Sequence, residues 1–227
     1  MKNMPEHILP QDIERRSFEI IGEELAGKVL VINGAQKVED LPDERVQERI
    51  IHLIKRCIHT TADFEYAESM WISEGAVAVF DHLTDEKATI VTDTNMALAG
   101  INKKKAESFG CRAVCFMADE EVAAEASRRQ VTRAMVSLEK AMQLTGPVIY
   151  VVGNAPTALL AICDRYDKKE RIPDLVIGVP VGFVNVEAAK DLILERDIHY
   201  IGNKGRKGGS NVAAAIMNAL LYTKEKE

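Results

Sequence analysis

The chain has 227 residues, of which 47% are hydrophobic and 28% charged, a composition typical of a globular protein that buries a substantial core. Its formal net charge of −6 argues against non-specific binding to nucleic acid or to anionic membranes, because both depend on an excess of basic residues. The N-terminal segment lacks the apolar core of a signal peptide, and no apolar run approaches the roughly 20 residues that cross a membrane. We therefore expect one cytoplasmic domain over residues 1–227.

Two amphipathic helices are predicted in the first part of the chain, at residues 10–26 and 43–58. In the second, apolar residues recur every three or four positions and form one stripe, with charged residues off it. A weak strand signal lies at 29–32. We expect residues 1–70 to form a helical segment that packs on a sheet.

The rest of the chain alternates strands with helices. Short apolar runs bounded by turn residues predict strands at 89–93, 111–116, 148–153, 175–180 and, more weakly, 199–203. Helices are predicted at 73–83, 119–144, 155–166, 187–195 and 210–221, with a break near 130–132. The first four strands are continuously apolar, as parallel strands covered on both faces are. The pattern predicts an α/β fold in which a parallel sheet is flanked by helices on both faces, a three-layer arrangement of the Rossmann or flavodoxin kind.

Ligands of such folds bind beyond the carboxyl ends of the strands, where the strand order reverses. The turns after the predicted strands hold small and polar residues, among them Thr94, Asn95, Asn154 and Phe183, and all of them lie on one rim. The Asn154 turn could equally be only a strand–helix junction, because Pro156 suits the first turn of a helix. There is no dinucleotide fingerprint G-x-G-x-x-G and no phosphate-binding loop, which argues against a nucleotide cofactor.

Residues 202–210, with the sequence GNKGRKGGS, carry the strongest physical signal. Four glycines let successive backbone N–H groups face a ligand, and Ser210 can cap the helix that follows. Lys204, Arg206 and Lys207 add positive charge to a chain that is otherwise acidic. The segment predicts a site for carboxylate or phosphate, and the alternative interpretation is a flexible solvated loop.

His59 follows the second predicted helix and precedes the segment TTADFE. At a helix C-terminus the helix dipole favours an imidazolium, which is a suitable general acid near neutral pH. Asp63 and Glu65 could orient this ring or stabilise its charge. Arg133, at the predicted helix break, could bind a carboxylate through two hydrogen bonds. A lone histidine is more often structural, however, and a lone arginine is more often a surface residue.

The four cysteines, Cys57, Cys111, Cys115 and Cys163, form no C-x-x-C pair and fit no common zinc spacing. Cys111 and Cys115 lie within an apolar run, where thiols pack as small hydrophobic groups. We therefore expect reduced core cysteines and no metal site.

Several segments of the chain together resemble one protein family. They are IERRSFEII (13–21), IHTTADFEYAE (58–68), IVTDTNMALAGI (90–101), TR (132–133), GNAPTALL (153–160), PDLVIGVPVGFV (173–184) and GRKGGSNVAAAIMNALL (205–221). In this order they are similar to the precorrin-8X methylmutases, including the cobalt-precorrin-8 forms. The combination is highly specific, because chance similarity would not reproduce several long segments in order.

This resemblance implies an α/β fold and an isomerase of cobalamin biosynthesis that acts on a tetrapyrrole, a corrin precursor. The implied reaction is an intramolecular [1,5]-sigmatropic shift of a methyl group, which gives hydrogenobyrinate or cobyrinate. No added cofactor is expected, because any cobalt belongs to the substrate. The family also implies a homodimer with sites near the subunit interface.

The resemblance assigns roles to individual residues. His59 matches the family's catalytic histidine, which would protonate or hydrogen-bond the conjugated ring as the methyl group migrates. Substrate-binding roles are implied for Ser17, Thr94, Asn95, Arg133, Asn154, Phe183, Arg206, Lys207 and Ser210. Basic and hydroxyl side chains suit a substrate with many carboxylates, whereas Phe183 and Met96 suit the walls of a site for a flat macrocycle.

Two stretches depart from the family's pattern. After GFVN the family usually has Glu-Ser-Lys, whereas here Ala188-Ala189-Lys190 follows Glu187, which predicts an altered contact at that helix start. Residues 29–39 also differ from the usual spacer and could form an extra hairpin or part of a dimer contact.

Two other functions stay open at the level of the sequence. A corrinoid carrier would keep the fold and the anion-binding loop, but it would have no need of His59 with an intact TTADFE segment. An unrelated α/β enzyme that acts on a phosphorylated metabolite would be expected to carry one of the missing phosphate fingerprints.

Overall fold

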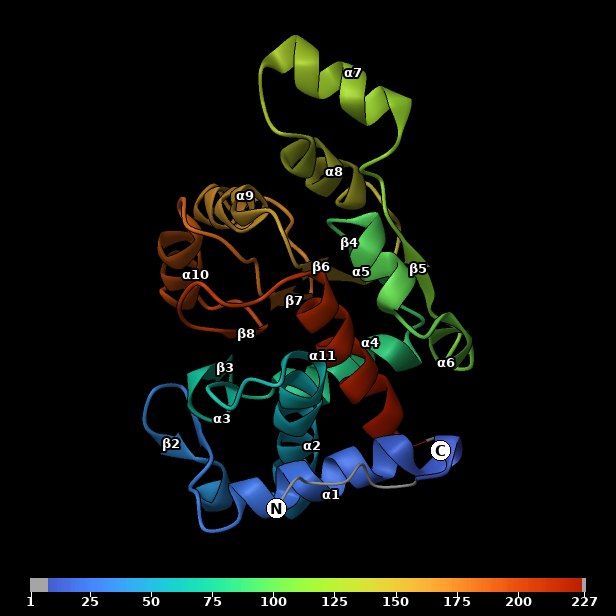
Figure 1. Ribbon diagram of the computed structural model, residues 1–227. Helices are drawn as coiled ribbons and strands as arrows, with labels where there is room; N and C mark the ends of the chain where they lie inside the picture. Colours follow the sequence, from blue (N-terminus) through green and yellow to red (C-terminus); the bar gives the residue numbers. More distant parts are fainter. Residues whose placement is uncertain (1–7, 226–227) are drawn as a thin grey trace.

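The computed structural model describes residues 8–225 and shows an α/β fold around one central sheet (Figure 1). The sheet has six strands in the spatial order β3-β8-β7-β6-β4-β5. These strands are β3 (Met70–Ile72), β4 (Thr89–Thr92), β5 (Arg112–Val114), β6 (Val148–Val152), β7 (Leu175–Gly178) and β8 (Tyr200–Asn203). Neighbouring strands pair in parallel except at one edge, where β3 runs antiparallel to β8.

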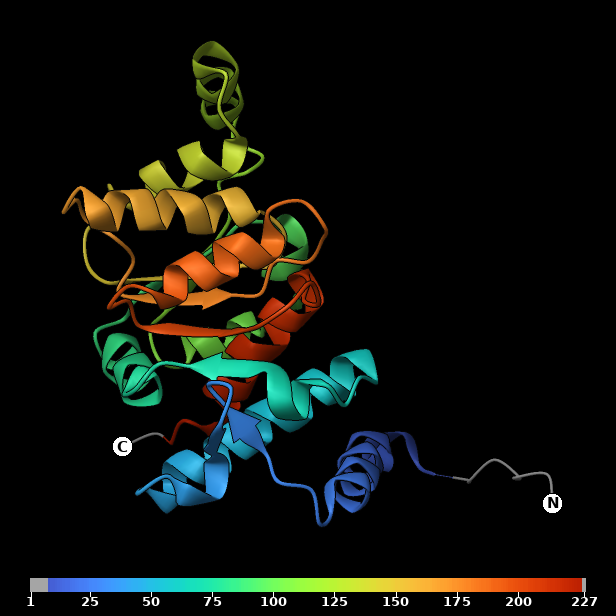
Figure 2. The same ribbon diagram turned by 90° about the vertical axis from the view of Figure 1, so that its left-hand side faces the viewer.

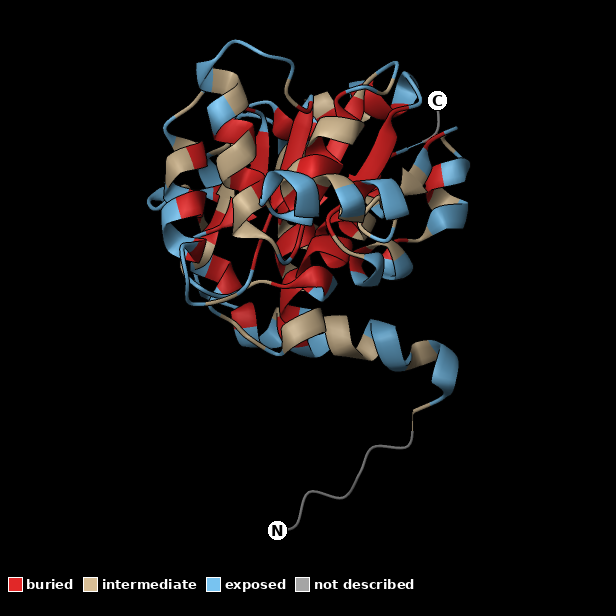
Figure 3. Cartoon of the chain, turned by 90° about the horizontal axis from the view of Figure 1, so that it is seen from above, coloured by how far each residue is buried: buried red, intermediate tan, exposed pale blue. Residues whose placement is uncertain are grey.

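Helices cover both faces of the sheet, which confirms the predicted architecture. On one face the apolar core draws on α2 (Glu44–Thr61), α3 (Tyr66–Ser69), α4 (Ala76–Asp85), α6 (Lys103–Glu107) and α11 (Ser210–Thr223), with α5 (Asn95–Gly100) packed on α11. On the other face it draws on α8 (Arg133–Ala141), α9 (Pro156–Asp167) and α10 (Val186–Leu194), and α7 (Glu120–Arg129) packs on α8. Figure 3 shows the buried residues concentrated in the central strands between these layers.

The N-terminal part of the chain lies at the periphery (Figures 1 and 2). A 3-10 helix, η1 (Pro10–Asp12), leads into α1 (Ile13–Leu25), and a hairpin of β1 (Val31–Ile32) and β2 (Gln36–Lys37) precedes a second 3-10 helix, η2 (Val38–Asp40). The helices expected within residues 1–70 are therefore present as α1 and α2, the weak strand signal at 29–32 corresponds to β1, and the first seven residues lie outside the described ones. The hairpin agrees with one of the two interpretations of residues 29–39.

Helix α2 connects this periphery to the body of the protein. The Asp43 side chain caps its start by accepting hydrogen bonds from the backbone N–H groups of Arg45 and Val46. Its apolar stripe is buried, chiefly against α11. The helix ends where Ala62 adopts a left-handed conformation, so its end lies three residues beyond the predicted one and its last turn includes His59.

The strand order reverses between β4 and β6. The chain passes from β4 outward to β5, returns to β6 on the other side of β4, and continues to β7 and β8. Because β4 and β6 are parallel, with Thr92 opposite Val151, their carboxyl ends meet at the same edge of the sheet. This is the position at which open α/β sheets bind their ligands.

Most of the predicted elements are confirmed, with ends displaced by a few residues. The break in the long helical segment is confirmed between α7 and α8, where Gln130 has a left-handed backbone. The antiparallel strand β3 and the short helices α3, α5 and α6 were not predicted, because segments this short carry no clear periodicity. Within residues 8–225 no helix is long and apolar enough to cross a bilayer.

The cysteines behave as the sequence indicates. All four are free, and Cys57, Cys111 and Cys163 are buried while Cys115 is half-buried. Burial raises the pKa of the Cys57 thiol to about 12, so this side chain stays protonated at neutral pH.

A buried ion pair joins α2 to α4 and α11. Arg49, only 5% exposed, makes two hydrogen bonds to the Asp81 carboxylate, at 2.5 and 3.0 Å, and a third to the Thr223 hydroxyl at 3.2 Å. Lys224 reaches the same region and bonds to the Asp81 carbonyl and the Asp85 carboxylate. The three helices are thus joined through charges as well as through apolar packing.

We expect Arg49→Met to lower the free energy of unfolding by about 2 kcal/mol, because it leaves the Asp81 carboxylate half-buried with only Lys224 near it. Arg45→Met in the same helix is the matched control: Arg45 pairs with Glu225 on the surface, where an ion pair contributes little. Urea unfolding of both variants measures the difference. Equal stability of the two variants would contradict a structural role for the Arg49 ion pair.

Candidate functional site at the carboxyl edge of the sheet

Asp93 organises the point at which the strand order reverses. It follows β4 directly, is fully buried, and accepts hydrogen bonds from three consecutive backbone N–H groups: Gly153 at 2.9 Å, Asn154 at 2.8 Å and Ala155 at 2.8 Å. Burial raises the pKa of Asp93, and the three N–H bonds oppose that shift because they stabilise the carboxylate. The carboxylate thus fixes the turn that carries Asn154. Asp93 was not among the predicted site residues, although a carboxylate directly after a buried strand is a usable signal.

Thr94 and Ser210 join this turn to the start of α11. The Thr94 hydroxyl accepts a hydrogen bond from the Ala97 N–H, which caps α5, and shares another with the Ser210 hydroxyl at 2.8 Å. The prediction that Ser210 caps α11 is wrong: Gly209 occupies the cap position, and the Ser210 side chain turns toward Thr94 instead. The backbone of Ser210 also approaches Gly153 so closely that a Cβ at Gly153 would overlap it.

The glycine-rich loop, residues 204–209, is held against its neighbours. The Gly209 N–H donates to the Val179 carbonyl at 2.8 Å, and Gly208 lies so close to the same carbonyl that no side chain fits there. From below, the Lys190 ammonium donates hydrogen bonds to the Gly205 and Lys207 carbonyls. The loop is therefore an ordered part of the edge, unlike the flexible solvated loop that was the alternative interpretation.

Arg206 and Phe183 form one side of this edge. The Arg206 guanidinium lies 5.5 Å from the centroid of the Phe183 ring and bonds to the Glu187 carboxylate at 2.7 Å. Phe183 is 84% exposed. Val184 and Met96 are also largely exposed, so large apolar side chains gather on an edge that is otherwise polar. Glu187 lies at the start of α10, where the sequence departs from the family's pattern, and the altered contact expected there stays a prediction.

Lys207 connects the glycine-rich loop to the end of α2. Its ammonium pairs with the carboxylates of Asp63 at 2.5 Å and Glu65 at 2.6 Å. These pairs raise the pKa of Lys207 and lower that of Asp63. Both carboxylates are thus engaged by Lys207, which is distant in sequence, and their action on His59 stays a prediction.

His59 lies exposed in the last turn of α2, and its ring contacts Phe18 of α1. The two ring centroids are 5.3 Å apart, and the other neighbours of Phe18 are the His52 ring at 5.5 Å and the Arg56 guanidinium at 4.8 Å. His52, Arg56 and His59 share one face of α2 because they are four and three residues apart. Phe18 packs along this face and so restricts the orientation of the His59 ring.

Two further candidate residues, Ser17 and Arg133, belong to α1 and α8. Ser17 precedes Phe18, and its hydroxyl donates to the Ile13 carbonyl in the same helix. Arg133 is exposed in the first turn of α8, and Thr132 beside it shares a hydrogen bond of 3.1 Å with Thr157 in the first turn of α9. That bond places Arg133 near the turn that carries Asn154. Asn95 and Asn154 are both exposed there.

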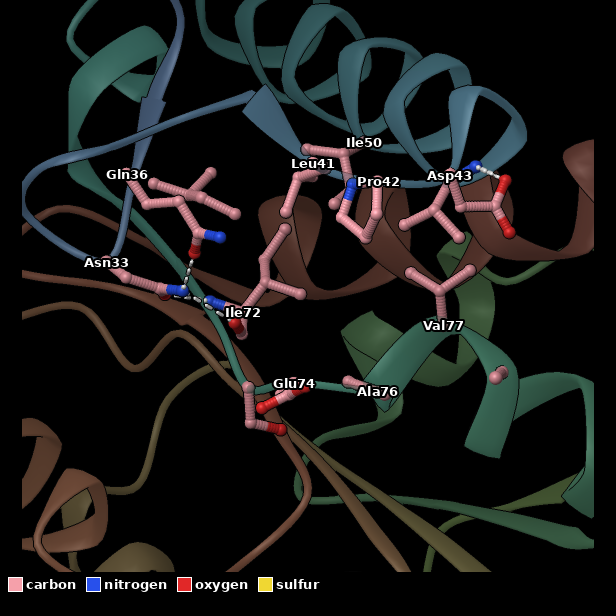
Figure 4. A pocket seen from close by; sticks show the side chains of 15 residues that line it. Asn33, Gln36, Leu41, Pro42, Asp43, Ile50, Ile72, Glu74, Ala76 and Val77 are labelled. Carbon is pink, nitrogen blue, oxygen red and sulfur yellow. Dashed lines mark hydrogen bonds between the residues drawn. The ribbon is translucent and has the colours of Figure 1, made fainter. Parts of the chain in front are cut away.

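A cavity of about 360 Å³ lies elsewhere, at the amino end of β8 (Figure 4). It is lined by residues of the hairpin segment, the start of α2 and the start of α4. On one side the Asn33 side chain makes two hydrogen bonds with the backbone of Ile72. Leu41, Ile50 and Val77 contribute apolar side chains to the wall of the cavity. None of the candidate residues lines this cavity. Within residues 8–225, no cluster of three or more His, Cys, Asp or Glu side chains is placed to bind a metal ion.

Comparisons with known proteins agree on one family. The family model described as CbiC, precorrin-8X methylmutase, matches residues 12–223. The cobalt-precorrin-8 methylmutase of Leptospira interrogans is 39% identical, with 96% of each chain covered, and that of Salmonella typhimurium is 37% identical, with 94% of this chain and 95% of the relative covered. A crystal structure of the precorrin-8X methylmutase of Thermus thermophilus superposes with a TM-score of 0.76 at 36% identity, over 93% of this chain and 95% of that one.

We expect Asp93→Asn to lower the free energy of unfolding by about 2 kcal/mol, because an amide nitrogen would face backbone N–H donors and leave at least one of them unpaired. Thermal unfolding measures this loss. Asp174→Asn is the matched control, since Asp174 accepts one backbone N–H, from Val148, which an amide oxygen can also accept. A loss for Asp93→Asn no larger than for the control would contradict the role given to Asp93.

Proposed function

We propose, on the premise that this chain belongs to the precorrin-8X methylmutase family, that His59 and the residues of the carboxyl edge carry out the family's reaction. The chain is a methylmutase of cobalamin biosynthesis, an isomerase that moves a methyl group within a corrin precursor. Family membership confirms the resemblance that its sequence segments indicate. The observation that carries the proposed site is the convergence of the candidate residues on the edge where the strand order reverses.

The carboxylates of the substrate are bound by the basic and hydroxyl groups of this edge. Arg206 is exposed on an ordered loop, and its hydrogen bond to Glu187 leaves other guanidinium N–H groups to meet a carboxylate. Arg133 lies at the start of α8, beside the Asn154 turn, where the helix dipole also favours an anion. Lys207 adds positive charge but is shared with Asp63 and Glu65. The ring periphery is thus recognised by several separate groups.

The exposed apolar side chains of the edge suit the flat body of the macrocycle. Phe183, Val184 and Met96 are among the most exposed large apolar residues within 8–225. A monomer leaves them in water, whereas a large conjugated ring laid across them buries their apolar surface. The neighbouring Arg206 then lies where it meets the carboxylates at the rim of the same ring.

His59 acts as the proton donor of the reaction. A methyl shift within one molecule needs no nucleophile, since the bond to one ring carbon breaks as the bond to the next one forms. Catalysis therefore rests on holding the ring and on stabilising the charge that develops as the methyl group moves. An exposed histidine at the end of α2, oriented by Phe18, supplies a proton or a hydrogen bond to the conjugated ring.

The active form is a homodimer in which α1 contributes to the interface. Ile13 and Ile20 lie on one face of α1 and are both exposed, and Ser17 lies between them on that face. A second copy would cover these side chains and bring Ser17 into a shared site. It would also enclose a ligand that one subunit leaves open at the edge. The cytoplasmic location expected from the sequence stays a prediction.

We expect His59→Ala to abolish conversion of precorrin-8X while the protein still binds it, because loss of a general acid lowers rates by about 10²–10⁴. The absorption spectrum distinguishes substrate from corrin product and so reports both steps, with metal-free and cobalt-containing substrate compared. His199→Ala, also exposed but at the amino end of β8, is the control. Unchanged conversion by His59→Ala would exclude this residue from the mechanism, and binding without conversion by the wild type would favour a carrier.

We expect the double variant Ile13→Glu/Ile20→Glu to be monomeric, because four buried carboxylates would destabilise a two-fold interface through α1. Analytical ultracentrifugation gives the mass. The conservative pair Ile13→Leu/Ile20→Leu keeps the apolar surface and should leave the mass that of a dimer. A dimer that persists in the glutamate variant would place the interface elsewhere.

A further inference from the structure

Lys190 is a buried cation beneath the glycine-rich loop. It lies in α10, on the side that packs against the sheet, and is only 1% exposed. Lysine is rarely this buried unless its ammonium is paired with a carboxylate. Within residues 8–225 no carboxylate lies within ion-pair distance of its Nζ atom. The buried ammonium must therefore be stabilised by other partners, and the glycine-rich loop supplies two of them.

The Lys190 ammonium instead donates three hydrogen bonds to neutral oxygens. Its partners are the Asn203 side-chain oxygen at 3.1 Å, the Gly205 carbonyl at 2.9 Å and the Lys207 carbonyl at 2.7 Å. Asn203, equally buried, donates in turn to the carbonyls of Lys204 and Lys207. These bonds satisfy the three donors of the ammonium and draw the backbone of the loop around it.

The loop that Lys190 holds is the one that carries Arg206. With the carbonyls of Gly205 and Lys207 directed down to the ammonium, the residue between them is held at the outer edge. The Gly182 N–H also donates to the Arg206 carbonyl at 3.2 Å, which fixes the same segment from the side. Without the cation, the Gly205 carbonyl would lose this donor and the Lys207 carbonyl would keep only that of Asn203, so the loop would have to rearrange.

The charge of Lys190 is not neutralised by its surroundings. Of the acidic groups nearest to it, Glu187 is bonded to Arg206, while Asp191 points from the exposed side of α10. Asp63 and Glu65, which face the loop from the end of α2, are paired with Lys207. Lys204 directs its own charge over the Trp71 ring. The positive potential of Lys190 is thus available to an anion on the outer side of the loop.

We propose that Lys190 is a positioning residue for substrate carboxylates: its buried ammonium shapes the loop that presents Arg206 and attracts the anion bound there. This rests on the proposed function, since it assigns the carboxylates of the corrin precursor to this loop. Lys190 has no access to the ring itself, so it affects how tightly the macrocycle binds and not the rate at which bound substrate reacts.

Binding and protonation of Lys190 are coupled. Burial lowers its pKa to about 8, with Glu187 and Asp191 opposing the shift. A carboxylate on the far side of the loop favours the charged form and raises this pKa. Affinity is therefore greatest below pH 8 and falls as the pH rises through the pKa of the free protein, by about tenfold for each unit that binding shifts the pKa.

The test compares Lys190→Met with Lys204→Met. Both remove one lysine charge at the same loop, but Lys204 is exposed and makes no bond to the loop carbonyls. Hydrogenobyrinate, the metal-free corrin product, is titrated into each protein between about pH 6.5 and 9.5, and conversion of precorrin-8X is measured at saturation. We expect Lys190→Met to raise Kd about tenfold at pH 7, to remove the pH dependence, and to leave kcat within about threefold of the wild type.

Lys204→Met should change Kd by less than about threefold and keep the pH dependence of the wild type. Equal effects of the two substitutions, or a wild-type affinity that is constant across pH 8, would overturn the role of Lys190 while leaving the methylmutase function intact. If Lys190→Met does not fold, the wild-type pH profile and that of Lys190→Arg, which should show no decline near pH 8, decide the matter. A wild type that neither binds nor converts would instead contradict the proposed function.

Discussion

The carboxyl edge of this sheet depends on burying two side chains of opposite charge, Asp93 and Lys190, beneath the backbone of the candidate site. Asp93 accepts three N–H groups of one turn, and Lys190 donates three hydrogen bonds, two of them to carbonyls of the glycine-rich loop. Burying a charge is unfavourable unless its hydrogen bonds are satisfied, so each charge imposes one conformation on the segment around it. The outward-facing residues of both segments are positioned as a consequence.

The rest of the site is attached to this edge through contacts between distant parts of the chain. The Thr94–Ser210 hydrogen bond joins the end of β4 to the start of α11, and the pairs of Lys207 with Asp63 and Glu65 bring the end of α2 to the loop. His59 is thereby located relative to a loop almost 150 residues further along the chain. The proton-donor role that we propose for His59 depends on this placement beside a partly apolar surface.

The two faces of the sheet contribute different residues to the candidate site. The α8–α10 face carries Arg133 and Lys190 toward the edge, whereas the opposite face carries α2 and, through it, His59. Helix α1 adds Phe18 against His59 and leaves Ile13 and Ile20 exposed. The site therefore lies where both layers meet the end of the sheet, next to a peripheral helix whose outer face has no partner within residues 8–225.

The sequence by itself determined the alternation of strands and helices, the break at Gln130, the basic glycine-rich segment and, through its motifs, the family, because these are properties of neighbouring residues or of short periodic patterns. It did not reveal strand β3, the carboxylate of Asp93, the burial of Lys190 or the pairing of Lys207 with Asp63. The Asp93 and Gly153 groups that bond are 60 residues apart, and a lone Asp or Lys has the same local pattern whether it is solvated or buried. Only the tertiary structure decided these partners, since they are set by which strands and loops become neighbours.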